Sequence, residues 1–194
     1  MCRTVFFIIF TAALVLMLTM PVFPAELNLG QNNFAVKLDS IHFKDKALND
    51  LDHGFYVGLE GYGDLGQNFY IGAEVGYVSI DGSVENLGFR EDRELIYIPI
   101  EVNLKYTIKI IKGLVCDLGA GVSYNYAKEG PTGNGFSPAV DEWLWGGQLF
   151  GDLNYRIGKF FVGGNVKYQT TKEGNDFKHD YDNLRAGGQI GVMF

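Results

Sequence analysis

Cysteine is almost missing from this sequence, and so is any long apolar run beyond its first 20 residues. Of the two cysteines, Cys2 lies in a segment that we expect to be removed, so Cys116 is left alone and no intrachain disulfide is predicted. The lack of about 18 consecutive apolar residues after position 25 argues against a membrane-spanning helix there. The net charge of −7 at pH 7 argues against nucleic acid as a partner.

The first 25 residues have the pattern of a secretory signal peptide. Arg3 supplies a positive charge, residues 4–20 are almost wholly apolar, and Pro21–Ala25 leads into the polar Glu26. We expect cleavage after Ala25, which divides the chain into a signal peptide, 1–25, and one mature domain, 26–194. The alternative is an N-terminal anchor helix, for which residues 4–20 stand at the short limit of the usual length.

Glycine is abundant, at 26 of 194 residues, which is about twice the usual ~7%. It recurs in segments with a period of two, as Leu184–Phe194 shows. One face of this segment is apolar at every position except one glycine, and the other face carries Arg185, Gln189 and further glycines. A period of two is typical of a β-strand whose two faces meet different surroundings.

Eight segments alternate in this way: Asn33–Phe43, Gly54–Gly63, Phe69–Ile80, Ile96–Tyr106, Leu114–Asn125, Trp143–Arg156, Phe160–Gln169 and Leu184–Phe194. Short turns at 64–68, 111–113 and 157–159 alternate with longer polar loops at 44–53, 81–93, 127–141 and 171–182. We therefore predict an all-β fold, an eight-stranded antiparallel up-and-down transmembrane β-barrel with both termini at the short-turn end. Pro99 lacks an N–H group, and we expect a bulge or one missing bond there.

The glycines indicate which face points inward. Eight of them share the face that carries the charges: Gly58, Gly72, Gly76, Gly119, Gly121, Gly146, Gly163 and Gly187. The interior of an eight-stranded barrel is just wide enough for side chains to fill, so small residues must offset large ones. We predict that the charged face is the interior, and that the apolar face meets lipid with aromatic girdles at both ends. A soluble carrier of the lipocalin type would show the inverse arrangement.

On these eight segments, on Ile98–Ile100 and on the terminal Val192–Phe194, the mature chain resembles the small bacterial outer-membrane β-barrel family of the OmpA transmembrane domain and OmpX type. The resemblance implies a monomer in the cell outer membrane of a Gram-negative envelope, in contact with outer-membrane lipid. It also implies that Phe194 belongs to the insertion signal read by the barrel-insertion machinery. It implies little about activity.

The predicted interior charges are the first candidate site. The acids are Asp39, Glu60, Glu74, Glu101, Asp117 and Asp152, and the bases are Lys37, Lys105, Arg156, Lys167 and Arg185. Buried ions have to be paired, because their desolvation otherwise dominates. Such a network either plugs the interior or lines a narrow path for ions or small solutes.

The histidines are the second candidate site. His42, His53 and His179 all lie at the loop end, near Asp50, Asp52, Asp180 and Asp182. Loops 44–53 and 171–182 flank adjacent strands in a closed barrel, so His53 and His179 could approach a shared metal. Solvated loop histidines are more common, and the prediction is that the protein has no metal and no cofactor.

Ser40 and His42 project from one face of the first segment, and some outer-membrane lipid A deacylases use a Ser and a His on the barrel wall. The sequence places no carboxylate to orient the imidazole, so we predict no catalytic residues and no enzyme.

These observations predict an integral outer-membrane barrel with a salt-bridged, plugged interior and four extracellular loops, which acts in envelope integrity or surface interaction. An extracellular ligand would be bound through the acidic loops. The second hypothesis is a narrow channel for small solutes or ions, and the third is a lipid-modifying enzyme.

Overall fold

A computed structural model gives the fold as one closed antiparallel barrel, in which each strand pairs with its neighbours in sequence and β1 pairs with β8. Its strands are β1 Asn33–Phe43, β2 His53–Gly66, β3 Phe69–Asn86, β4 Phe89–Ile111, β5 Leu114–Pro131, β6 Val140–Ile157, β7 Phe160–Thr171 and β8 Asn183–Met193. The structure describes residues 32–194 except 46–47, 49–50, 87–88, 132–138 and 175–179. The predicted eight-stranded antiparallel barrel is confirmed, and the predicted signal peptide lies outside the described residues.

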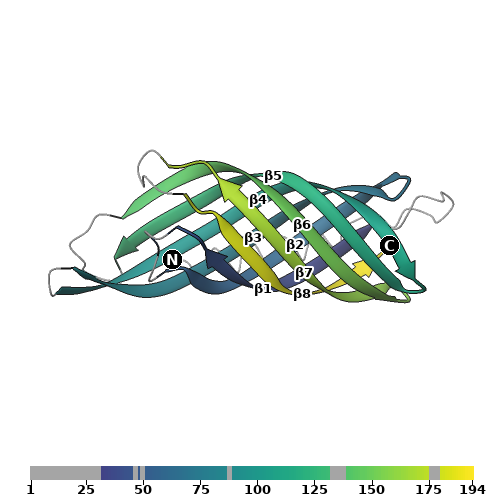
Figure 1. Ribbon diagram of the computed structural model, residues 1–194, viewed down its shortest axis with the longest axis horizontal. Coiled ribbons are helices and arrows are strands. Elements are labelled where there is room, and N and C mark those ends of the chain that lie inside the picture. Colours follow the sequence, from purple (N-terminus) through teal and green to yellow (C-terminus); the bar gives the residue numbers. More distant parts are fainter. Residues whose placement is uncertain (1–31, 46–47, 49–50, 87–88, 132–138, 175–179) are drawn as a thin grey trace.

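The strands are tilted against the long axis of the barrel (Figure 1). Tilt is what closes eight strands into a ring, and closure leaves no free edge along the barrel wall. In the described part of the chain, no helix is long and apolar enough to cross a membrane.

The segment 81–93, predicted as a loop, is instead the end of a long hairpin. β3 and β4 stay paired from Ile80↔Leu95 to Asn86↔Phe89, and their outer ends reach beyond the shorter strands of the barrel (Figure 1). The loop prediction was wrong because the sequence of this segment is mostly polar at both alternating sets of positions, so it lacks the two-faced pattern although its backbones pair. The predicted loop 127–141 is likewise shortened, by β5 up to Pro131 and β6 from Val140.

Pro99 interrupts one ladder without shifting its register. Pairing of β3 with β4 stops at Val75↔Ile100 and resumes at Val78↔Tyr97, while β4 pairs with β5 continuously through Pro99↔Asn125. Of the two predicted alternatives at Pro99, the constant register excludes the bulge, and the gap in pairing confirms the interrupted bonding expected from the missing donor of proline. The register shifts lie beside short turns, at Asp64/Gly66 and Lys109/Ile111.

Apolar side chains cover the outer face and charged ones fill the centre of the interior, as predicted from the glycines. Phe55 is 82% exposed and Trp145 is 58% exposed, whereas Glu74 and Glu101 are buried at 2% and 0%. Rings pair on the outer surface, with centroids 4.9 Å apart for Phe69–Tyr106 and 4.7 Å for Tyr124–Trp143. The inverse arrangement of a soluble carrier is thereby excluded.

Candidate functional site

The centre of the lumen is built from an acidic wall and a basic wall. Glu60, Glu74 and Glu101 are direct cross-strand neighbours on β2, β3 and β4. Lys167 and Arg185 are direct neighbours on β7 and β8. Like charges placed opposite each other in a sheet repel, so neither wall is stable alone. Each requires the other across the barrel.

Ion pairs join the two walls. Lys167 Nζ lies 2.5 Å from Oε2 of Glu74 and 2.5 Å from Oε2 of Glu101. Arg185 pairs with Glu101 and lies 3.7 Å from Oε1 of Glu74. Lys37 on β1 completes the set, with Nζ 2.7 Å from Oε2 of Glu60 and 3.3 Å from Oε2 of Glu74. Three acids therefore meet three bases, and the cluster is neutral.

Polar and aromatic groups complete this cluster. The hydroxyl of Tyr56 donates to Glu74 Oε1 at 2.5 Å, and the Arg185 guanidinium lies 4.4 Å from the centre of the Tyr56 ring. All six ionic side chains are 3% exposed or less. The ion pairs thus bridge the lumen from β1–β4 to β7 and β8, and we call this cluster of six ionic side chains the ion-pair strut.

A second, smaller group lies towards the short-turn end. Lys105 Nζ is 3.4 Å from Asp117 Oδ2 and 3.7 Å from the centre of the Tyr62 ring. Thr107 and Asn154 donate to the same carboxylate at 2.6 and 3.1 Å. Asp117 is thus held by three donors from β4 and β6.

The remaining predicted charges lie outside these two groups. Asp39 accepts a hydrogen bond from Asn165 at 2.9 Å. Asp152 is buried, and neither of its carboxylate oxygens has a hydrogen-bond partner among the described residues. Arg156 is half-buried and lines a small cavity with Lys105 and Asp117.

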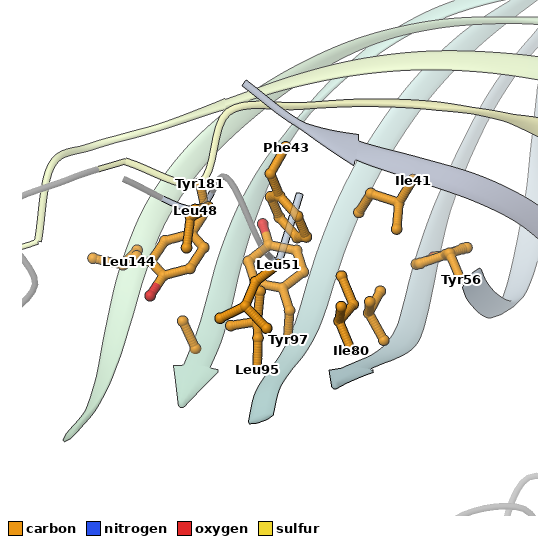
Figure 2. Packing of buried hydrophobic residues seen from close by; sticks show 12 residues of the cluster. Ile41, Phe43, Leu48, Leu51, Tyr56, Ile80, Leu95, Tyr97, Leu144 and Tyr181 are labelled. Carbon is orange, nitrogen blue, oxygen red and sulfur yellow. The ribbon is translucent and has the colours of Figure 1, made fainter. Parts of the chain in front are cut away.

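An apolar plug fills the loop end of the lumen, and sequence reasoning missed it. Its members are Ile41, Phe43, Leu48, Leu51, Tyr56, Val78, Ile80, Leu95, Tyr97, Ala127, Leu144 and Tyr181. Figure 2 shows these side chains gathered inside the ends of the strands, with the two loop leucines among them. The signal was present in the sequence, because inward positions change from charged to apolar at the outer ends of the strands.

Tyr181 anchors the segment just before β8 to this plug. Its hydroxyl donates to Glu129 Oε1 at 2.6 Å, its backbone N–H donates to Thr171 Oγ1 at 2.7 Å, and its ring stacks on Tyr97 with centroids 5.8 Å apart. Burial, and then the neighbouring Glu129 carboxylate, raise the pKa of the Tyr181 hydroxyl well above its usual value. The residue is held as a neutral donor.

A third group of polar side chains, His42, Asp52 and His53, lies at the outer rim of the barrel, where β1 ends and β2 begins. His42 and His53 are the last pair of the β1–β2 ladder, and their ring centroids are 4.2 Å apart. Asp52 Oδ1 lies 2.7 Å from His53 Nδ1, and Asp52 Oδ2 lies 3.7 Å from His42 Nδ1. The structure thus joins His53 to His42, whereas the predicted partner His179 lies outside the described residues, as does Asp50.

Ser40 is exposed and, within the described residues, makes no hydrogen bond to His42. The structure does supply a carboxylate near His42, from Asp52, which the sequence did not indicate. The absence of enzymatic activity remains a prediction. The same holds for the role of Phe194 in insertion, although that residue is tied to the barrel by its N–H, which donates to Asn32 O at 2.9 Å.

A closed ring of eight strands with an apolar outer face and an ionic interior defines the class of this protein. It is a membrane β-barrel of the outer-membrane type, in which every wall amide can find a partner within the ring.

Solved structures with this fold are bacterial outer-membrane proteins. Neisserial surface protein A is 12% identical, with 84% of this chain and 96% of that chain covered and a TM-score of 0.58. A major outer membrane protein from Thermus thermophilus is 10% identical, with coverage of 84% and 99% and a TM-score of 0.58. Ail, the attachment invasion locus protein of Yersinia pestis, is 12% identical, with coverage of 86% and 99% and a TM-score of 0.55.

No protein-family model matches the sequence, and no curated protein is significantly similar to it. The likeness to solved structures therefore concerns the fold, which is that of the small outer-membrane barrels. Together with the apolar outer face, this fold places the protein in the outer membrane, as the sequence predicted.

Proposed function

We propose that this protein is a closed, non-conducting barrel that supports the cell envelope and presents its loops and its long hairpin for contacts at the cell surface. The observation that carries the proposal is the filling of the lumen at two levels, by the ion-pair strut in the centre and by the apolar plug at the loop end.

The two levels block the lumen for different physical reasons. An ion crossing the plug would have to leave water between buried side chains such as Leu48, Leu95 and Tyr97. An ion crossing the strut would have to separate Lys167 and Arg185 from Glu74 and Glu101, leaving buried charges unpaired. Both costs favour a barrel that stays closed.

The long hairpin supports the surface part of the proposal. β2 pairs with β3 only up to Tyr56↔Val78, and β5 pairs with β4 only up to Arg93↔Pro131, while β3 and β4 continue to Asn86↔Phe89. A two-stranded ribbon beyond the barrel offers backbone donors and acceptors to an added strand. Ail, the attachment invasion locus protein of Yersinia pestis, shares this fold, which is consistent with such a role.

Planar-bilayer recording of the refolded protein tests the closed barrel. The expected result is no stable unit conductance, beside a large porin that conducts under the same conditions. Stable channels of uniform size would instead support the second hypothesis, a narrow path for ions.

Shortening the hairpin tests the surface role separately. Replacing residues 83–92 by a two-residue turn joins the paired Gly82 and Arg93, so it keeps the strand register and should leave the amount of folded barrel in the membrane unchanged. It should reduce adherence of cells that carry the protein, or their survival under envelope stress. Unchanged adherence and survival would contradict the surface role and leave the closed barrel standing.

A further inference from the structure

We propose that His42, Asp52 and His53 form a binding site for a divalent transition-metal ion, Zn²⁺ or Cu²⁺, on the outer rim of the barrel. One ligand atom from each residue can be chosen so that all three lie within 4.8 Å of one another. The proposal does not depend on whether the barrel conducts or on what its hairpin contacts.

The backbone holds two of the three ligands opposite each other. His42 and His53 pair directly in the β1–β2 ladder, so their side chains leave the sheet side by side. Asp52 precedes His53, and its carbonyl accepts a hydrogen bond from the Phe43 N–H at 2.7 Å. The strand register therefore brings the ligands together, rather than a chance meeting of mobile side chains.

Asp52 already lies within hydrogen-bond distance of His53, whereas its gap to His42 suits a metal ion better than a hydrogen bond. His42 Nδ1 is buried, has no hydrogen-bond partner among the described residues, and lies 3.7 Å from Asp52 Oδ2. Two ligand atoms bound to one Zn²⁺ at about 2.0–2.1 Å stand roughly 3.4 Å apart in tetrahedral geometry. An ion between His42 and Asp52 would satisfy the ring nitrogen that otherwise lacks a partner.

The donor set also indicates which ions would bind. Two imidazole nitrogens and one carboxylate suit zinc, copper and nickel, whereas magnesium and calcium prefer oxygen ligands. The His42 and His53 side chains are 45% and 67% exposed, so the remaining coordination positions are open to water or to a ligand from outside. A three-residue site of this kind is reached directly from the external medium.

The site lies where the segment 44–52 leaves and rejoins the barrel. His42 precedes this segment, Asp52 ends it, and between them Leu48 and Leu51 insert into the apolar plug. A metal ion that bridges both ends would close the loop and favour the arrangement in which the leucines cap the lumen. Metal binding should therefore stabilise the folded barrel.

Calorimetric titration of the refolded, tag-free protein with Zn²⁺ tests the site. The expected result is one equivalent bound, with at least a tenfold loss of affinity in His42→Gln and in His53→Gln. Asp52→Asn should also weaken binding, whereas Glu173→Gln, which removes an exposed acid elsewhere at the loop end, should not. No binding, or binding that the histidine variants leave unchanged, would overturn the proposal.

Electron paramagnetic resonance of the Cu²⁺-loaded protein gives a readout that does not depend on affinity. The proposal predicts two coordinated nitrogens in the wild type and one in either histidine variant. The same number of nitrogens in all three proteins would overturn it. Far-UV circular dichroism shows whether each variant is folded, and His42→Ala and His53→Ala replace any glutamine variant that is not.

Discussion

The ring of Tyr56 lies so close to the backbone of Gly76 that a Cβ atom at position 76 would overlap it. The same relation holds for Tyr62 on Gly72, Phe150 on Gly119 and Phe161 on Gly191. Large interior rings are thus seated on strand positions that have no side chain. This pairing of large with absent side chains explains why glycine collects on the inward face of the barrel.

Gly76→Ala should destabilise the barrel by about 1–3 kcal/mol, because the added methyl displaces Tyr56 and with it the hydrogen bond to Glu74. Gly188→Ala is the matched control, since its Cβ would meet its nearest atom at 3.6 Å. The control should change stability by about 0.5 kcal/mol or less. Urea unfolding in lipid vesicles measures both, and equal losses would contradict the seating of Tyr56.

Lys167→Met should cost about 3–5 kcal/mol, because it removes one of the two cations that the neighbouring buried carboxylates of Glu74 and Glu101 share. Adding Glu101→Gln to this variant should recover part of the loss, since one unpaired charge is then removed. Lys159→Met, at an exposed turn position, is the control and should have little effect. A Lys167→Met barrel as stable as the wild type would contradict the claim that the ion-pair strut stabilises the folded barrel.

Leu51→Ala should cost about 2–4 kcal/mol, because this side chain is 2% exposed within the apolar plug. It should also speed protease cleavage within residues 44–52. Leu65→Ala, at a leucine that is 59% exposed, should leave both stability and cleavage unchanged. Similar cleavage rates in the two variants would show that the loop is not anchored by its leucines.

Tyr181→Phe should cost about 1–3 kcal/mol, because the buried Glu129 loses a hydrogen-bond donor. Tyr124→Phe, on the outer girdle, is the control.

Burial raises the Tyr181 pKa, so the folded state keeps the phenol proton at a pH where the unfolded chain has lost it. This contribution is therefore present below pH about 10 and falls as the pH rises further. The stability measured from pH 8 to 11 should decline less in Tyr181→Phe than in the wild type. The same decline in both proteins would contradict the burial of a protonated Tyr181 hydroxyl.

The sequence allowed the strands and their orientation to be predicted, because a barrel wall imposes one rule on every strand. Inward and outward positions alternate, so residues such as Glu74 and Trp145 reveal their surroundings by their place in the period. The same rule fails beyond the membrane, where both faces meet water. This is why the hairpin end at 81–93 was predicted as a loop.

The contacts across the lumen could not be predicted from alternation. The period places Lys167 and Glu74 inside the barrel, but their meeting depends on the shear of eight strands, which no local pattern encodes. The two loop leucines of the plug could not be predicted for a related reason. Leu48 and Leu51 sit in a polar segment, and their burial depends on where that segment folds back across the barrel mouth.

The most direct test of the whole account uses the two tryptophans, Trp143 and Trp145, which both lie on the outer face and are the only ones in the chain. Their fluorescence is recorded after the barrel is refolded into vesicles whose lipids carry bromine at defined depths. The account predicts strong quenching by bromine near the membrane interface and weaker quenching by bromine at the bilayer centre. Fluorescence that brominated lipid at every depth leaves unchanged would contradict it, because the rings would then be enclosed by protein.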